Sequence, residues 1–133
     1  MNSLRKKLLI VDDDDSIRNS VKLAIEEQEY VQFDIAESVD VASGIQKMKD
    51  MHPDIVILDL HLPDMSGFDL MDIVNKNKSL ANTKVIMLTV DDTLANIFKA
   101  ESKGINAFHF LGKPYNIEDL QALVLSLCLP DKT

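Results

Sequence analysis

The sequence is poor in residues that cross-link a chain or interrupt it. Its 133 residues include one cysteine, no tryptophan, four glycines and four prolines. Because Cys128 is the single cysteine, an intramolecular disulfide and a cysteine-based zinc site are excluded. Cys128 lies among Leu125, Leu127 and Leu129, so we interpret it as a packing residue of a helix.

Long apolar runs and clustered positive charge are also missing. Segments such as 8–11, 55–58 and 85–88 are much shorter than the roughly 20 apolar residues of a membrane span. Aspartates at positions 12–15 follow the first of them, where a signal peptide would need about 7–15 apolar residues. The net charge of −8 disfavours direct nucleic-acid binding, which depends on clustered Lys and Arg. We therefore expect a cytoplasmic protein that binds neither membrane nor nucleic acid directly.

Hydrophobic residues nevertheless form 46% of the chain, which is typical of a folded domain. Five short apolar segments are predicted to be strands. Four of them are nearly continuously apolar, as expected for parallel strands that are covered on both faces. The predicted strands are Leu8–Asp12, Gln32–Ala36, Ile55–Asp59, Lys84–Thr89 and Ala107–Leu111.

Between and after these segments, apolar residues recur every three or four positions, which predicts five helices. Ser66 with Asp69 resembles a capping box before the third helix, and Asn116 with Asp119 opens the fifth. The residues that mark the five predicted helix faces are Ile17, Val21, Ala24, Ile25 and Gln28; Val41, Ile45 and Met48; Leu70, Ile73 and Val74; Leu94, Ile97 and Phe98; and Ile117, Leu120, Leu123, Val124 and Leu127.

The fivefold alternation of strand and helix predicts an α/β fold. We expect a single domain over residues 1–133, with a core from about residue 7 to residue 129. Crossover connections are right-handed, so an open, doubly wound, five-stranded parallel sheet is expected, and five units are too few to close a barrel. Such sheets bind ligands outside the carboxyl ends of their strands.

Polar residues occur where the predicted strands end. Asp12 and Asp13 end the first strand, Asp59 the third and Thr89 the fourth, while Lys113 follows the fifth. Three carboxylates in one cleft repel each other and require a cation, and oxygen ligands favour Mg²⁺, with Mn²⁺ or Ca²⁺ as alternatives. An Asp can form an aspartyl phosphate. Phosphoryl transfer needs positioning and charge neutralisation, which Mg²⁺, Lys113 and the Thr89 hydroxyl would provide.

Each of these features, taken alone, has an ordinary structural explanation. The run Asp12–Asp15 would be a solvated loop, and we expect Asp14 or Asp15 to cap the helix that follows. Thr89 would be a plain strand end, and Lys113 would belong to a turn. The convergence of all these positions on one rim of the sheet favours a functional site.

Five sequence motifs, in this order, resemble the receiver domain of bacterial response regulators, and the resemblance covers nearly the whole chain. It implies a flavodoxin-like sheet with strand order 2-1-3-4-5, which is the fold of a chemotaxis regulator of this family. The motifs are Leu9–Asp14, Pro53–Pro63, Met65–Gly67, Val85–Thr89 and Lys113-Pro114.

The resemblance implies a role for each matching residue of the metal site. Asp59 corresponds to the phosphoacceptor, and Asp12 and Asp13 to the acid pair that holds Mg²⁺, with Mn²⁺ as an alternative. His61 occupies the position that offers its backbone carbonyl to the metal. Lys113 corresponds to the lysine that pairs with the phosphoryl group, followed by a cis Pro114.

The resemblance also implies two switch residues and shows two departures. Thr89 corresponds to the switch hydroxyl and Phe110 to the switch aromatic, whose phenyl ring can respond by packing only. Val90 stands where the family has a small residue, which predicts slow phosphorylation by small donors and slow hydrolysis. The segment 104–113 is about two residues longer than usual, so Phe108 is an alternative to Phe110. Alternation in a strand puts both on the same face, and we favour Phe110 because it lies three residues before Lys113.

The implied function is that of a phosphorylation-dependent signalling switch and not that of an enzyme with its own substrate. A sensor histidine kinase or a histidine phosphotransfer protein would donate phosphate to Asp59. The altered surface of the fourth helix, fifth strand and fifth helix would then change affinity for a downstream protein target. We expect a monomer or a phosphorylation-linked dimer, with no output domain in this chain.

Three alternatives compete with this interpretation. A haloacid-dehalogenase-type phosphatase would need a second Asp where His61 stands. A flavin-binding module would need a Ser/Thr/Gly-rich phosphate loop after the first strand, but the loop here is acidic. A receiver-like interaction module that is never phosphorylated is the third alternative.

Overall fold

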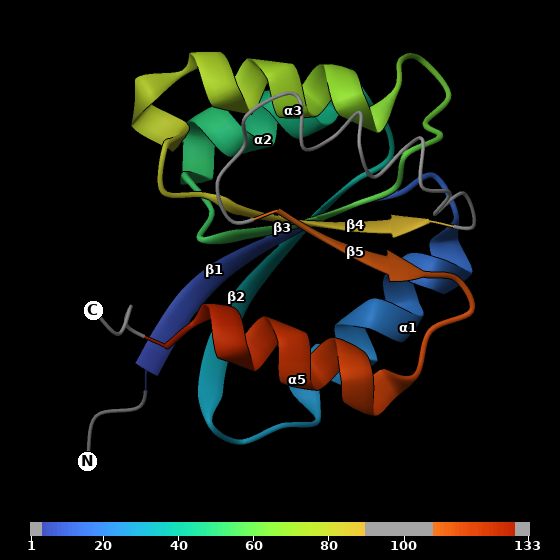
Figure 1. Cartoon of the computed structure of the whole chain (residues 1–133), viewed down its shortest axis with the longest axis vertical. Helices are drawn as coiled ribbons and strands as arrows, with labels where there is room; N and C mark the ends of the chain where they lie inside the picture. Colours follow the sequence, from blue (N-terminus) through green and yellow to red (C-terminus); the bar gives the residue numbers. More distant parts are fainter. Residues whose placement is uncertain (1–3, 90–107, 130–133) are drawn as a thin grey trace.

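A parallel five-stranded sheet with the strand order β2-β1-β3-β4-β5 forms the centre of the protein. The computed structural model describes residues 4–89 and 108–129. Figure 1 shows its elements, which are β1 (Leu4–Val11), α1 (Asp15–Glu26), β2 (Val31–Ser38), α2 (Val41–Met51), β3 (Ile55–Leu58), α3 (Gly67–Lys76), the short 3₁₀ helix Lys78–Leu80, β4 (Lys84–Thr89), β5 (Phe108–Gly112) and α5 (Ile117–Leu127). The predicted fold class and strand order are confirmed.

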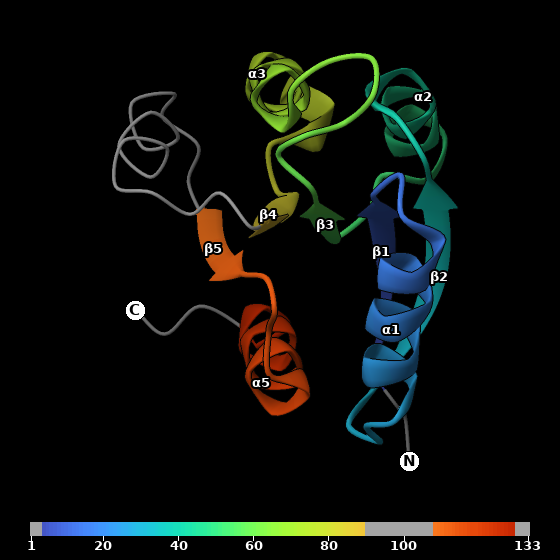
Figure 2. The ribbon, with the colours of Figure 1, turned by 90° about the vertical axis from the view of Figure 1, so that its right-hand side faces the viewer.

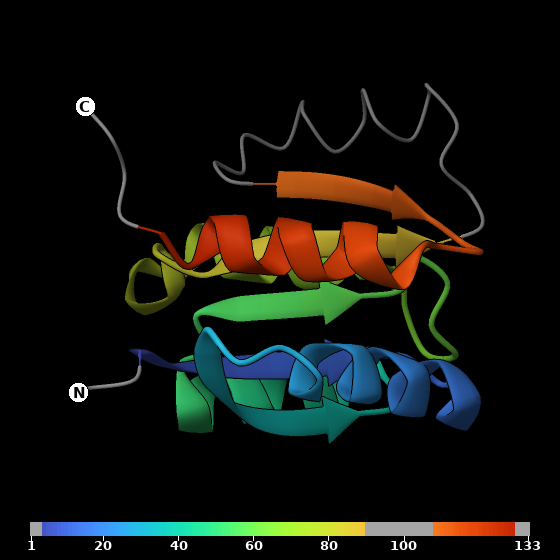
Figure 3. The ribbon, with the colours of Figure 1, turned by 90° about the horizontal axis from the view of Figure 1, so that it is seen from below.

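Helices cover both faces of the sheet. Figure 2 shows α2 and α3 on one face and α1 and α5 on the other, and Figure 3 shows the strand arrows pointing in one direction. Alternate residues of a strand face opposite sides. In β1, Leu9 packs in the cluster beneath α2 and α3, whereas Leu8 and Ile10 pack in the cluster beneath α1 and α5. Burial on both faces explains why the central strands are continuously apolar.

The strand boundaries differ from the prediction mainly at the first two strands. β4 has the predicted bounds, and β3 ends at Leu58, one residue earlier than predicted. β1 begins four residues early because it pairs with β2 over its whole length, from Leu4 opposite Val31 onward. The added residues are mostly exposed and pair through the backbone, so an apolar pattern could not reveal them.

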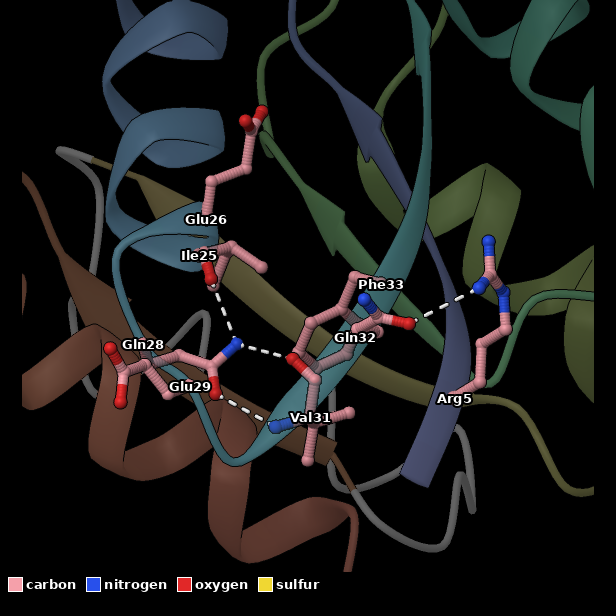
Figure 4. A pocket seen from close by; sticks show the side chains of 8 residues that line it. All are labelled: Arg5, Ile25, Glu26, Gln28, Glu29, Val31, Gln32 and Phe33. Carbon is pink, nitrogen blue, oxygen red and sulfur yellow. Dashed lines mark hydrogen bonds between the residues drawn. The ribbon is translucent and has the colours of Figure 1, made fainter. Parts of the chain in front are cut away.

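The first helix ends before the predicted Gln28, and Gln28 closes the following turn instead. Its side-chain amide donates to the carbonyl oxygens of Ile25 at 2.9 Å and Val31 at 2.7 Å, and its own oxygen accepts from the Val31 amide at 3.0 Å. Figure 4 shows these bonds beside a pocket of about 400 Å³ at the amino edge of the sheet. The prediction of Gln28 as a helix-face residue was wrong. A glutamine that closes the turn after a helix can follow the last helix-face residues by the same three or four positions that mark a helix face.

The helix starts follow the predicted capping chemistry. Asp14 caps α1, Ser66 and Asp69 form a complete capping box on α3, and Asn116 caps α5. Cys128 is buried at the end of α5, as predicted. Ile117 is 45% exposed, so its predicted place on the packed face of α5 was wrong; the buried stripe begins at Leu120, one turn later.

Some predictions concern residues that the structure does not describe. The predicted fourth helix, with Leu94, Ile97 and Phe98, and the departure at Val90 lie outside the described residues. No helix within residues 4–89 and 108–129 combines the length and the apolar character that a membrane crossing requires. The domain boundaries at residues 1 and 133 stay a prediction.

Candidate acidic site at the carboxyl edge of the sheet

Three carboxylates converge where two neighbouring strands end. Asp12 and Asp13 follow β1, and Asp59 follows β3, which pairs with β1. One carboxylate oxygen from each residue lies within 4.8 Å of the other two. Asp12 is 3% exposed, the side chain of Asp59 is 12% exposed, and Asp13 lies at the surface. The cluster therefore has a buried floor and one side open to solvent.

Lys113 brings a positive charge to this cluster from the loop between β5 and α5. Its ammonium nitrogen donates to Asp12 Oδ2 at 2.8 Å and lies 3.6 Å from Asp59 Oδ2. Burial alone would lower the pKa of Lys113, but the hydrogen bond to Asp12 and the charges of Asp12 and Asp59 outweigh it and raise the pKa. Lys113 is therefore charged at neutral pH. The Lys113-Pro114 peptide bond is cis, as the family resemblance implied.

Asp59 lies in an environment that disfavours its negative charge. Burial raises the pKa of Asp59, the Lys113 charge opposes this, and the nearby Asp12 charge adds to the increase. Lys113 alone does not neutralise the three carboxylates, which leaves two negative charges in a partly buried site. A divalent cation with a preference for oxygen ligands matches both the donor atoms and this excess charge.

Backbone hydrogen bonds between the strands continue to Asp12 and Asp59, and they fix the backbone from which these two carboxylates project. The Asp59 amide donates to the Val11 carbonyl at 3.0 Å, and the Asp12 amide donates to the Ser38 carbonyl at 3.1 Å. Within the first loop, the Asp14 amide donates to Asp12 Oδ1 at 2.9 Å. The three sheet strands β2, β1 and β3 therefore position Asp12 and Asp59 through consecutive ladder bonds.

Gly67, at the start of α3, lies directly against the backbone of Asp59. A Cβ atom added to Gly67 would lie 2.6 Å from the Asp59 carbonyl oxygen and 3.1 Å from Leu60 Cα. The Gly67 amide donates to the Leu60 carbonyl at 2.7 Å, and His61 pairs with Ser66 in an isolated antiparallel bridge. The sequence motif contained Gly67, but sequence reasoning gave it no role. Its position directly after a capping Ser was the available signal.

The two predicted switch residues, Thr89 and Phe110, belong to the paired strands β4 and β5. Thr89 is the last residue of β4 and pairs with Gly112 of β5, so its backbone reaches the edge at which Asp59 lies. Phe110 pairs with Met87 and packs, half-buried, against the apolar cluster beneath α2 and α3. Their assignment as switch residues stays a prediction.

Comparison with known proteins identifies the family. A model described as the response regulator receiver domain matches residues 8–125 of this chain. The protein therefore belongs to the response regulator receiver domain family, whose members are signalling switches that phosphorylation controls and not classical enzymes.

The relatives differ in the fraction of their own length that aligns with this chain. Protein PilG of Pseudomonas aeruginosa is 27% identical over 114 residues, which are 86% of this chain and 81% of PilG. The DNA-binding dual master transcriptional regulator RpaA of Synechocystis is 30% identical over 121 residues, which are 91% of this chain but 48% of RpaA. The chain thus spans about half the length of RpaA. The structure of the chemotaxis response regulator CheY4 of Vibrio cholerae matches with a TM-score of 0.76 and 28% identity, over 92% of this chain and 98% of that one.

Proposed function

We propose that this chain is a switch that accepts a phosphoryl group on Asp59, with Mg²⁺ held by Asp12, Asp13 and Asp59 and by the backbone carbonyl of His61. The observation that carries this proposal is the convergence of three carboxylates within 4.8 Å of one another, with the Lys113 ammonium between two of them. An acidic loop alone would not place a partly buried cation beside the same two carboxylates.

The donor we propose is a phosphohistidine on a sensor histidine kinase or a histidine phosphotransfer protein. A carboxylate oxygen of Asp59 attacks phosphorus, the new O–P bond forms, and the P–N bond breaks with its electron pair leaving on the imidazole. Lys113 pairs with the phosphoryl oxygens as Asp59 loses its charge. The metal ion, when bound, neutralises the charge that develops on those oxygens.

The response to phosphorylation follows from the charge that is added at Asp59. A phosphoryl group brings new acceptor oxygens to the rim of the sheet, which attract the Thr89 hydroxyl and the Lys113 ammonium. We infer that Phe110 then repacks against its apolar cluster and changes the surface that binds a downstream protein. No direct contact between this chain and nucleic acid is proposed, although RpaA is described as DNA-binding. Cytoplasmic location and a phosphorylation-linked dimer stay predictions.

Intact-mass measurement tests the proposal directly. The wild type is incubated with a small phosphoramidate donor and Mg²⁺, and we expect a gain of one phosphoryl group that a chelator abolishes. Asp59→Asn should show no gain. Asp34→Asn, an exposed Asp paired with Arg5 far from the site, should behave as the wild type. An equal gain in Asp59→Asn would disprove the assignment. No gain in the wild type, with this donor or with a phosphorylated histidine kinase, would favour the interaction module.

A further inference from the structure

Arg18, in the first turn of α1, is a second partly buried cation at the acidic site. Its side chain is 11% exposed, and Nη1 donates to the backbone carbonyl oxygen of Asp12 at 2.7 Å. Arginine side chains are mostly exposed, so one that is largely covered is expected to have partners for its donors. Arg18 has no place in the family motifs identified in the sequence, and the proposed function assigns it no task.

Two carboxylates hold the guanidinium in place. Nε donates to Glu37 Oε1, near the end of β2, at 3.2 Å, and Nη2 pairs with Asp15. Burial alone would lower the pKa of Arg18, but the bonds and charges of Asp15 and Glu37 outweigh it and raise the pKa. A planar guanidinium can serve a carbonyl and two carboxylates at once, which a lysine ammonium on a flexible chain cannot do in the same geometry.

The contacts of Asp12 show what this arrangement achieves. Its Oδ2 accepts from Lys113, its Oδ1 accepts from the Asp14 amide, and its carbonyl oxygen accepts from Arg18. Each oxygen atom of Asp12 therefore has a donor, and both the side chain and the backbone of the residue are fixed. Because Asp13 follows directly, fixing the Asp12 carbonyl also fixes the peptide from which the Asp13 carboxylate projects.

We propose that Arg18 is a positioning residue of the metal site, which holds the turn of Asp12 and Asp13 in the geometry that binds the cation. This inference rests on the proposed function, since it assumes that the acidic cluster is a metal site. It also gives the end of β2 a task, because Glu37 holds Arg18. Residues that orient metal ligands typically change metal affinity about 10–100-fold when they are replaced.

The direction in which neutralising Arg18 changes the affinity for the cation separates a positioning role from a purely electrostatic one. Arg18 carries a positive charge beside a site for a positive ion, so Coulomb repulsion alone predicts that its neutralisation strengthens cation binding. Positioning predicts the opposite, because a loosened Asp12–Asp13 turn must be ordered again when the cation binds. Weaker cation binding by a folded variant that has lost the positive charge of Arg18 is explained by positioning and not by Coulomb repulsion.

The experiment measures Mn²⁺ binding to the whole chain by the loss of the free-ion electron paramagnetic resonance signal. Arg18→Gln removes both the positive charge and the planar set of guanidinium N–H donors, whereas Arg18→Lys keeps the charge and removes only the planar donors. We expect both variants to bind Mn²⁺ about 10-fold more weakly than the wild type. Arg5→Gln is the matched control, since Arg5 also pairs with a carboxylate, Asp34, but at the amino end of β1. It should bind as the wild type.

Three results would have different meanings. Tighter binding by Arg18→Gln, together with unchanged binding by Arg18→Lys, would show that Arg18 acts only through its charge and would overturn the proposal. Wild-type binding by both variants would reduce Arg18 to a structural residue and would also overturn it. Absence of Mn²⁺ binding by the wild type would refute the metal site and hence the proposed function itself. Urea unfolding in a chelator identifies a misfolded Arg18→Gln, in which case Arg18→Lys decides.

Discussion

Gly67, the first residue of α3, lies directly against the backbone of the phosphoacceptor candidate. No side chain fits there, because even a Cβ atom would lie 2.6 Å from the Asp59 carbonyl oxygen, and the atoms nearest to it are all backbone atoms of Asp59 and Leu60, which cannot move aside as a flexible side chain would. Gly44, inside α2, differs in this respect: an added Cβ would lie 3.4 Å from two methyl carbons of Val11, which is ordinary contact.

We predict that Gly67→Ala destabilises the protein by about 1–3 kcal/mol, the range for overpacking in a tight site. It should also weaken Mg²⁺ binding, since relief of the clash displaces the backbone of Asp59. Gly44→Ala should be neutral or stabilising by up to about 1 kcal/mol, because alanine favours a helix interior. Urea unfolding and Mg²⁺ titration of both variants check the prediction. Equal stability of the two variants would contradict the close approach.

At the scale of elements, a single Asp connects the loop after β3 to the start of α2. Asp64 accepts from the first two amides of that helix, Val41 at 2.9 Å and Ala42 at 3.0 Å, while Asp40, the residue before the helix, accepts from Ser43 at 2.8 Å. Two carboxylates thus satisfy three amides that a helix start leaves without partners. The same loop carries His61, so its attachment to α2 limits movement beside the acidic site.

Asp64→Ala should therefore lower the thermal unfolding midpoint at pH 7 by a few degrees. The bonds from Val41 first, and from Ala42, lower the pKa of Asp64. A lowered pKa means that its stabilisation is present above the unfolded-state pKa and is lost as the pH falls through the folded-state value. The difference from the wild type should vanish in acid. Asp50→Ala, at the carboxyl end of α2, is the control and should not lower the midpoint.

The elements show which features the sequence could predict. β4 and the capping box of Ser66 were predicted correctly, because an apolar run and a local hydrogen-bond pattern depend on neighbouring residues only. The converging positions of Asp12, Asp59 and Lys113 followed from parallel topology and family motifs together. The contacts of Arg18 and of Asp64 could not be predicted, since each joins segments about 20 residues apart through a geometry that no local pattern encodes.

At the scale of the whole molecule, the acidic site weakens the fold that positions it. Because burial raises the pKa of Asp59, the folded state favours its protonated form. The contribution of Asp59 to stability is therefore full below the unfolded-state pKa of Asp and is lost as the pH rises through the folded-state value. Above that folded-state value, in the absence of metal, the loss is complete. A bound cation would offset this loss of stability, because ligands that bind only the folded state stabilise it.

We predict that Asp59→Asn is more stable than the wild type by about 0.5–2 kcal/mol at pH 7 in a chelator, the common gain of a single stabilising substitution. The advantage should vanish near pH 3, where the wild-type carboxyl is protonated. Mg²⁺ at 100 times its Kd should stabilise the wild type by about 2.7 kcal/mol. It should stabilise Asp59→Asn much less, because that variant lacks one ligand, so the order of stability reverses. Urea unfolding with and without Mg²⁺ measures each value. A wild type that is more stable in the chelator would show that Lys113 outweighs the burial of Asp59.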